Sequence, residues 1–273
     1  DDLVLYRTGI IDQDQYLTII VENLNNVYKF AGVTQQSVAN SSLTSWVKYY
    51  RQDENSPNSI VSYYVKGSLV ALCLDLLLRS KSQFSLDSVM LHLFKLWQVN
   101  PIGVAEDEFP ALIQAATGVD LAEFIQQATE TTEMLPYVEL LAQFGLDLTT
   151  RLAKNHQDSG KFNLSTASAV PLVVGDLGAK LEKQALGYLV KNVYVDTPAE
   201  RAGLAANDLI VALNQVKLTN LEKQLAFIQN GESIELTLFR QERLLTLNLE
   251  LSSCAVKIFE LALNDAKLLL NWL

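Results

Sequence analysis

The spacing of apolar residues changes on either side of one polar stretch, residues 154–161. Before it, apolar side chains recur every three or four residues, as in Leu17, Ile20 and Leu24, which predicts amphipathic helices. After it they alternate with polar residues, as in Ile234 to Leu238, which predicts strands with one buried face. We therefore predict an α+β fold, with a helical bundle over residues 1–153, a linker at 154–161, a β-rich domain at 162–253 and a C-terminal helix at 254–273.

Six helices are expected before the linker. Their starts are marked by residues that cap a helix or favour its first turn: Asp12, Ser59, Ser85, the acidic run Glu106 to Glu108, Asp120 and Pro136. The helix after Ser59 is apolar nearly all round, so we expect it at the centre of the bundle. Beyond the linker, strands are expected at Leu172–Val174, Leu189–Val195, Leu209–Leu213, Ile234–Phe239 and Leu244–Leu251, with one helix at Asn220–Gln229 and a last helix from Val256.

Composition narrows the classes of function. The chain has 273 residues and a net charge of −10, without the basic cluster that nucleic acid requires, so no nucleic-acid partner is expected. Its longest apolar stretch, Leu69 to Leu78, contains Asp75 and is too short to cross a bilayer, so no transmembrane segment is expected. The two cysteines, Cys73 and Cys254, neither require nor exclude a disulfide.

The chain begins at Asp1-Asp2, with no initiator methionine and no signal-peptide pattern. We interpret it as a piece of a longer protein. The lack of a visible export signal favours a cytoplasmic location.

The most specific motif lies in the β-rich domain. Residues Thr197 to Asn214, T-P-A-E-R-A-G-L-A-A-N-D-L-I-V-A-L-N, resemble the bacterial PDZ signature S/T-P-A-x-x-A-G-L-x-x-G-D-x-I-x-x-I-N. Asn207 stands where that family usually has glycine, and asparagine also tolerates a positive φ. The resemblance extends from about Phe162 to Ser252.

PDZ domains bind an extended peptide, often a protein C-terminus, as an added strand beside a helix. The resemblance implies a carboxylate-binding loop at Leu177, Gly178, Ala179 and Lys180, and a groove helix that presents Leu221, Gln224 and Leu225. Leu221 and Leu225 could instead be core residues. A PDZ domain that only packs against its neighbour is a further alternative.

The helical region resembles the glycyl aminopeptidase family of gluzincin metallopeptidases, whose catalytic domain is followed by a PDZ domain. Two strings carry most of this resemblance, Trp46 to Arg51 and Glu54 to Gly67, and it extends over essentially the whole chain. It implies a zinc cofactor in the longer parent protein, bound through an H-E-x-x-H helix and a later glutamate.

This chain does not contain that ligand set. Its histidines, His92 and His156, do not lie in H-E-x-x-H, and the family's third ligand would fall just before Asp1. We expect both histidines to be structural or solvated. We therefore predict no metal ligands and no cofactor within this chain, and no tight zinc binding by it.

One catalytic side chain is expected to remain. The motif Tyr64-Val65-Lys66-Gly67 matches Y-x-K-G of the related aminopeptidase N family, in which the tyrosine hydroxyl stabilises the oxyanion of the tetrahedral intermediate. Tyr63 is the adjacent alternative. The competing interpretation is that Tyr64 only packs locally.

Two functions are compatible with these motifs. The first is the C-terminal part of a zinc-dependent aminopeptidase, inactive by itself, whose PDZ domain binds a peptide or protein C-terminus. The second is a non-catalytic PDZ adaptor. A serine protease is disfavoured because no G-x-S-x-G or comparable serine motif accompanies the two histidines.

Overall fold

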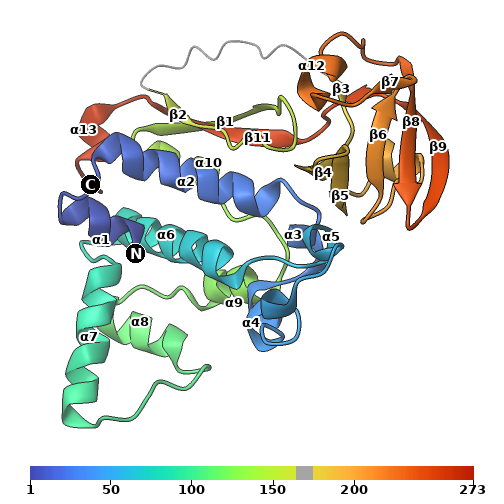
Figure 1. Ribbon diagram of the computed structural model, residues 1–273. Coiled ribbons are helices and arrows are strands. Elements are labelled where there is room, and N and C mark those ends of the chain that lie inside the picture. The colour runs from blue at the N-terminus through green and yellow to red at the C-terminus, as the bar shows by residue number, and fades with distance from the viewer. Residues whose placement is uncertain (164–174) are drawn as a thin grey trace.

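The computed structural model describes residues 1–163 and 175–273. They form an α+β structure in which most of the helices lie below one small sheet and a second, larger sheet stands apart as a β-rich domain (Figure 1). The predicted strand Leu172–Val174 lies outside the described residues.

The expected helices are present in the first 145 residues. Their bounds are α1 (Asp2–Arg7), α2 (Gln13–Tyr28), α3 (Gly32–Gln35), α4 (Val38–Leu43), the 3-10 helix η1 (Tyr49–Arg51), α5 (Ser56–Ser59), α6 (Tyr63–Lys81), α7 (Leu86–Val99), α8 (Phe109–Thr117), α9 (Ala122–Glu130) and α10 (Tyr137–Gln143). Asp12 caps α2 in a capping box, and Ser85 caps α7 in another. Gly118 ends α8 in a left-handed conformation.

The start of the central helix differs from the prediction. Ser59 ends the short α5 instead of capping α6, because Ile60 is extended (φ −129°, ψ 157°) and interrupts the helical backbone. Ser62 is the cap, and its hydroxyl accepts a hydrogen bond from the Val65 amide at 3.2 Å. The chain therefore turns before α6, and this turn places Tyr63 and Tyr64 at the helix start.

Helix α6 packs at the centre of the helical part, as expected. Its Leu69, Cys73 and Leu76 share one core with Leu17 and Leu24 of α2. Among the described residues, Ser56–Lys81 is the one helical stretch long and apolar enough to cross a membrane. The core helix of a soluble protein meets the same criterion of length and composition. The absence of a transmembrane segment stays a prediction.

The β-rich domain has a six-stranded sheet in the order β4-β5-β6-β8-β9, with β7 beside β6. Its elements are β3 (Gly175–Asp176), β4 (Ala179–Lys183), β5 (Tyr188–Val193), α11 (Pro198–Arg201), β6 (Leu209–Leu213), β7 (Val216–Lys217), α12 (Leu221–Leu225), β8 (Ser233–Arg240), β9 (Arg243–Glu250) and β10 (Ser252–Ser253). Four predicted strands coincide with β5, β6, β8 and β9. Asn207 has φ 71°, so it takes the backbone conformation of the glycine that it replaces.

The prediction of one helix from Val256 to Leu273 is wrong for most of that segment. Residues Lys257–Leu263 form strand β11, and only Ala266–Leu269 are helical, as α13. Strand β11 lies between β1 (Leu146–Leu152) and β2 (Phe162–Asn163). Five consecutive residues of β11 are buried, so its apolar run lacks the alternation that distinguishes a strand from a buried helix.

This strand also changes the domain organisation. Phe259 and Leu261 of β11, with Trp272, belong to the core formed by α2 and α6. The chain therefore leaves the helical part after β2, forms the β-rich domain, and returns to complete the sheet of the helical part (Figure 1). Strand β1 likewise lies inside the region 1–153, which was expected to be helical.

Candidate functional site

The two candidate catalytic tyrosines lie at the exposed N-terminus of α6. Their hydroxyls meet the hydroxyl of Tyr50, at 3.0 Å from Tyr63 and 2.7 Å from Tyr64. Tyr64 is 56% exposed, so its hydroxyl is accessible to a molecule outside the chain. The structure thus places both predicted residues in one cluster of hydroxyls.

The rings of this cluster support one another. Tyr63 and Tyr64 have ring centroids 4.2 Å apart, and Tyr49 packs edge-on against Tyr63 at 5.4 Å. Trp46 packs on Tyr50 at 5.0 Å. Because the rings restrict one another, the hydroxyls are held in a fixed arrangement.

The two tyrosines have different acidities. Hydrogen bonds from Tyr50 and then Tyr63 lower the pKa of Tyr64, since they stabilise its phenolate. Hydrogen bonds to Tyr50 and Tyr64 raise the pKa of Tyr63. A more acidic phenol is the stronger hydrogen-bond donor, so Tyr64 is the better candidate for contact with an oxyanion. Sequence reasoning had not assigned Tyr50 a role, although the aromatic run from Trp46 to Tyr50 was a visible signal.

Lys66, from the same motif, points inward. It is fully buried, and its Nζ has no hydrogen-bond partner among the described residues. Burial lowers the pKa of its ammonium group. Lys66 therefore does not share the exposed surface of Tyr64.

The described residues do not fit a gluzincin zinc site. His92 lies on α7 and His156 lies between β1 and β2, and neither begins an H-E-x-x-H sequence. No catalytic step through a zinc ion can be derived from the residues of this chain. Of the two states expected for His156, structural or solvated, the structure shows the first, because its side chain is only 9% exposed and contacts Asp176.

The predicted carboxylate-binding loop begins after β3 and includes the first two residues of β4. The Leu177 side chain is buried in the domain core, whereas Lys180 is exposed on β4. Gly178 has φ 78°, and its amide donates to Asp176 Oδ1 at 3.3 Å. Its carbonyl accepts hydrogen bonds from the Tyr194 amide at 2.9 Å and the Thr197 hydroxyl at 3.2 Å. The loop is thus fixed to the segment that precedes α11.

The groove helix is shorter than predicted, and its three candidate residues have different surroundings. Leu225 is 7% exposed and belongs to the core, while Leu221 packs at the margin of that core. Gln224 is occupied locally, since its Oε1 accepts from the Thr219 amide at 3.1 Å and its Nε2 donates to the Lys217 carbonyl at 3.3 Å. Leu225 is therefore a core residue of this structure, and its contact with a bound peptide stays a prediction.

Strand β4 is an edge strand. Within the described part of the chain it pairs with β5 and has no partner on its other side. Ala179 and Leu181 of β4 pack against the same core as Leu221 and Ile228. An edge strand and a helix that share one core form the framework to which a PDZ domain adds a peptide strand.

The string Glu54 to Asn58 connects the helical part with the β-rich domain. The Asn58 amide group donates to the Val193 carbonyl at 2.8 Å and accepts from the Val195 amide at 3.2 Å. The Glu54 carbonyl accepts from the Asn192 side chain at 2.9 Å. The part of the sequence that carried the family resemblance therefore positions the β-rich domain beside the start of α6.

Comparison with known families agrees with the division of the chain into a helical part and a β-rich domain. The family description "M61 glycyl aminopeptidase" matches residues 1–70, and "PDZ domain" matches residues 175–251. An aminopeptidase N family protein from Idiomarina loihiensis, of known crystal structure, is 34% identical with a TM-score of 0.89. The match covers 100% of this chain and 46% of that protein, so the chain spans about half the length of its structural relative.

Weaker structural similarities involve only part of the chain. The HtrA-type protease AlgW with a decapeptide is 22% identical over 30% of each chain, with a TM-score of 0.28. The serine endoprotease from Yersinia pestis is 24% identical over 30% of each chain, with a TM-score of 0.27. No curated protein matches the sequence.

The fold and the matched families define a peptidase-family chain that carries a PDZ domain. These matches are consistent with an M61 glycyl aminopeptidase-family protein that carries a PDZ domain.

Proposed function

We propose that the longer protein containing this chain is a zinc-dependent aminopeptidase, with zinc held by residues outside the chain. In this proposal, residues 1–153 complete the catalytic domain, and residues 162–253 form the PDZ domain. The hydrogen bond of 2.7 Å between Tyr50 and Tyr64 carries the proposal. It holds the exposed hydroxyl of Tyr64, the tyrosine of the matched Y-x-K-G motif, in a fixed position from which it can contact a substrate. The chain alone is expected to be inactive.

The proposed role of Tyr64 is to donate a hydrogen bond to the carbonyl oxygen of the substrate as that oxygen becomes negative. Such a contact is stronger in the transition state than in the ground state, so it accelerates the chemical step. Tyr50 would be a positioning residue, since it holds the Tyr64 hydroxyl and lowers its pKa. Tyr63 is the alternative donor.

The test uses the full-length protein and a panel of aminoacyl-p-nitroanilides, with and without a chelator. Tyr64→Phe should lower kcat by about 10²- to 10³-fold, as expected for an oxyanion donor. Tyr63→Phe is the matched control and should retain most activity. A larger loss in Tyr63→Phe would transfer the role to Tyr63, and an inactive, chelator-insensitive wild type would favour the PDZ adaptor.

Tyr50→Phe provides an independent readout of the hydroxyl cluster. Tyr64 must be protonated to donate, so activity should fall as pH rises through the pKa of Tyr64. Because Tyr50 lowers that pKa, its removal should shift the alkaline limb of the kcat profile to higher pH. An unchanged limb would contradict the positioning role.

We also propose that the PDZ domain binds an extended peptide or protein C-terminus along β4. The open edge of β4 and its shared core with α12 support this interaction. Fluorescence anisotropy with an acidic peptide, free or amidated at its C-terminus, would measure it. Lys180→Glu should weaken binding, while Lys183→Glu, at the far end of the same strand, should not. Equal binding by both variants would contradict this orientation of the peptide.

A further inference from the structure

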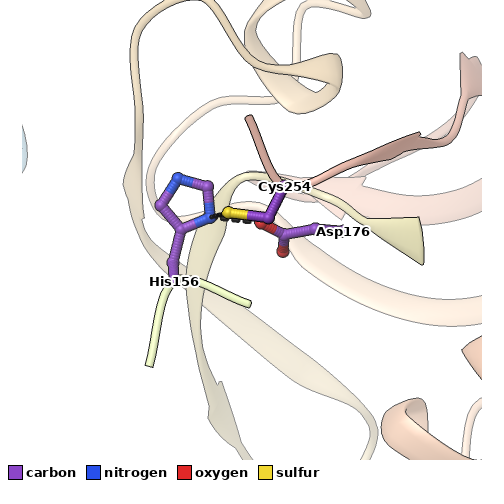
Figure 2. Close-up of side chains that lie close together, drawn as sticks. All are labelled: His156, Asp176 and Cys254. Carbon is purple, nitrogen blue, oxygen red and sulfur yellow. Dashed lines mark hydrogen bonds and ion pairs between the residues drawn. The ribbon is translucent and has the colours of Figure 1, made fainter. Parts of the chain in front are cut away.

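Three potential metal-binding side chains meet where the chain passes between the helical part and the PDZ domain. His156 lies between β1 and β2, Asp176 ends β3, and Cys254 follows β10 (Figure 2). One donor atom from each residue lies within 4.8 Å of the other two. Pairing of Ser252 with Asp176 in the small β10–β3 sheet brings Cys254 to this position.

The arrangement is not that of a Cys-His-Asp catalytic triad. In such a triad the carboxylate and the nucleophile contact opposite nitrogens of the imidazole. Here both face the same atom, since His156 Nδ1 contacts Asp176 Oδ2 and lies 3.7 Å from Cys254 Sγ. The nitrogen, oxygen and sulfur atoms gathered here are donor types that zinc accepts from proteins.

The surroundings hold these donors and limit access by water. The side chains of His156 and Asp176 are 9% and 14% exposed, and Cys254 is 4% exposed. The Tyr194 ring stacks on the imidazole, with centroids 4.5 Å apart and planes at 19°. The buried Asp176 carboxylate contacts His156 and accepts a hydrogen bond from the Gly178 amide, and a bound cation would further compensate its charge.

We propose that His156, Asp176 and Cys254 bind a zinc ion. A mixed set of imidazole, carboxylate and thiolate suits this cation, whereas magnesium and calcium prefer oxygen ligands alone. Three protein ligands leave one tetrahedral position for water or another ligand. This site is separate from the H-E-x-x-H site that the family resemblance implies, and it conflicts with the prediction that this chain has no metal ligands.

The site has a structural consequence. His156 precedes the PDZ domain and Cys254 follows it. One ion would therefore join the segment that enters this domain to the segment that leaves it. Asp176 also accepts the Gly178 amide through its other oxygen, Oδ1, at 3.3 Å. Zinc would therefore hold the PDZ domain against the helical part and fix the start of its carboxylate-binding loop.

Zinc titration of the purified, chelator-stripped 273-residue chain tests the proposal, with a chromophoric chelator as competitor. We expect one zinc per chain. Cys254→Ser and His156→Ala should weaken zinc binding at least about tenfold. Cys73→Ala and His92→Ala are matched controls, because they remove the other cysteine and histidine, and they should bind like wild type.

Cobalt substitution distinguishes this site from binding elsewhere. The cobalt-loaded chain should show a thiolate charge-transfer band that is lost in Cys254→Ser and retained in Cys73→Ala. Circular dichroism would establish that each variant is folded. Zinc-free wild type under these conditions, or equal affinity in Cys254→Ser, would overturn the proposal. Neither result would bear on aminopeptidase activity of the longer protein.

Discussion

The side-chain amide of Asn25 pairs with the backbone of Phe259, 234 positions further along the chain. Its Oδ1 accepts from the Phe259 amide at 2.7 Å, and its Nδ2 donates to the Phe259 carbonyl at 3.0 Å. Nδ2 also donates to the Ser159 carbonyl at 2.8 Å. One buried side chain on α2 therefore fixes the strand that returns from the PDZ domain and the segment that leads to it.

Asn25→Ala should destabilise the protein by about 2–4 kcal/mol, because it leaves buried backbone groups of Phe259 without partners. Urea unfolding followed by circular dichroism measures the change. Asn26→Ala, at an exposed position on the same helix, is the control and should change stability by less than about 0.5 kcal/mol. Equal effects of the two substitutions would contradict the importance of the Asn25–Phe259 pair.

A buried ion pair should make stability depend on pH. Burial favours the neutral form of Asp158, but two bonds from Arg151, at 2.6 and 3.2 Å, and backbone amides outweigh it and hold the pKa of Asp158 at about 2. An unfolded aspartate has a pKa of about 3.9. The stabilisation is therefore complete above about pH 4 and is lost as pH falls towards 2.

Asp158→Asn should lower the free energy of unfolding at neutral pH by about 1–3 kcal/mol. It should also flatten the decline of stability between about pH 4 and 2. Asp87→Asn removes an exposed partner of Arg7 and is the control, with an expected change below about 1 kcal/mol. The same acid dependence in Asp158→Asn and wild type would contradict this assignment.

Much of the fold could be predicted from local sequence patterns. The alternation in Ile234 to Leu238 specified a strand, and Asn207 was correctly expected to replace a glycine of positive φ. Strand β11 could not be predicted, because its buried run has no period of its own and its pairing with β1 spans more than a hundred residues. Long-range pairing decided its conformation.

The candidate sites likewise differ in whether a local sequence motif or long-range pairing brings their residues together. Tyr63 and Tyr64 were found because a short motif contains them, and the structure adds Tyr50, which is thirteen or fourteen positions away. His156, Asp176 and Cys254 share no motif, and their spacing matches no metal-binding pattern in the sequence. Only the pairing of β3 with β10 brings Asp176 and Cys254 together.

Gly178 provides a test of the PDZ loop. Its φ of 78° is unfavourable for other residues, and an added Cβ would overlap the Thr197 side chain. Gly178→Ala should destabilise the protein by more than about 2 kcal/mol and weaken peptide binding. Gly9→Ala is the control, since Gly9 has φ 75° but no atom within 4 Å of an added Cβ, and should cost only about 1–2 kcal/mol. Equal losses would show that backbone strain alone matters.

Lys66→Met should stabilise the isolated chain by about 1–3 kcal/mol at neutral pH, because it removes a buried ammonium group without a partner among the described residues. Burial lowers the folded pKa of Lys66, so between that pKa and about 10.4 the unfolded state holds more protons. The free energy of unfolding of the wild type should therefore rise relative to that of Lys66→Met as pH rises through this window. Thermal and urea unfolding of both proteins would measure the difference, with exposed Lys48→Met as the control. A destabilised Lys66→Met, or a pH-independent difference, would mean that the ammonium group has a stabilising partner in solution.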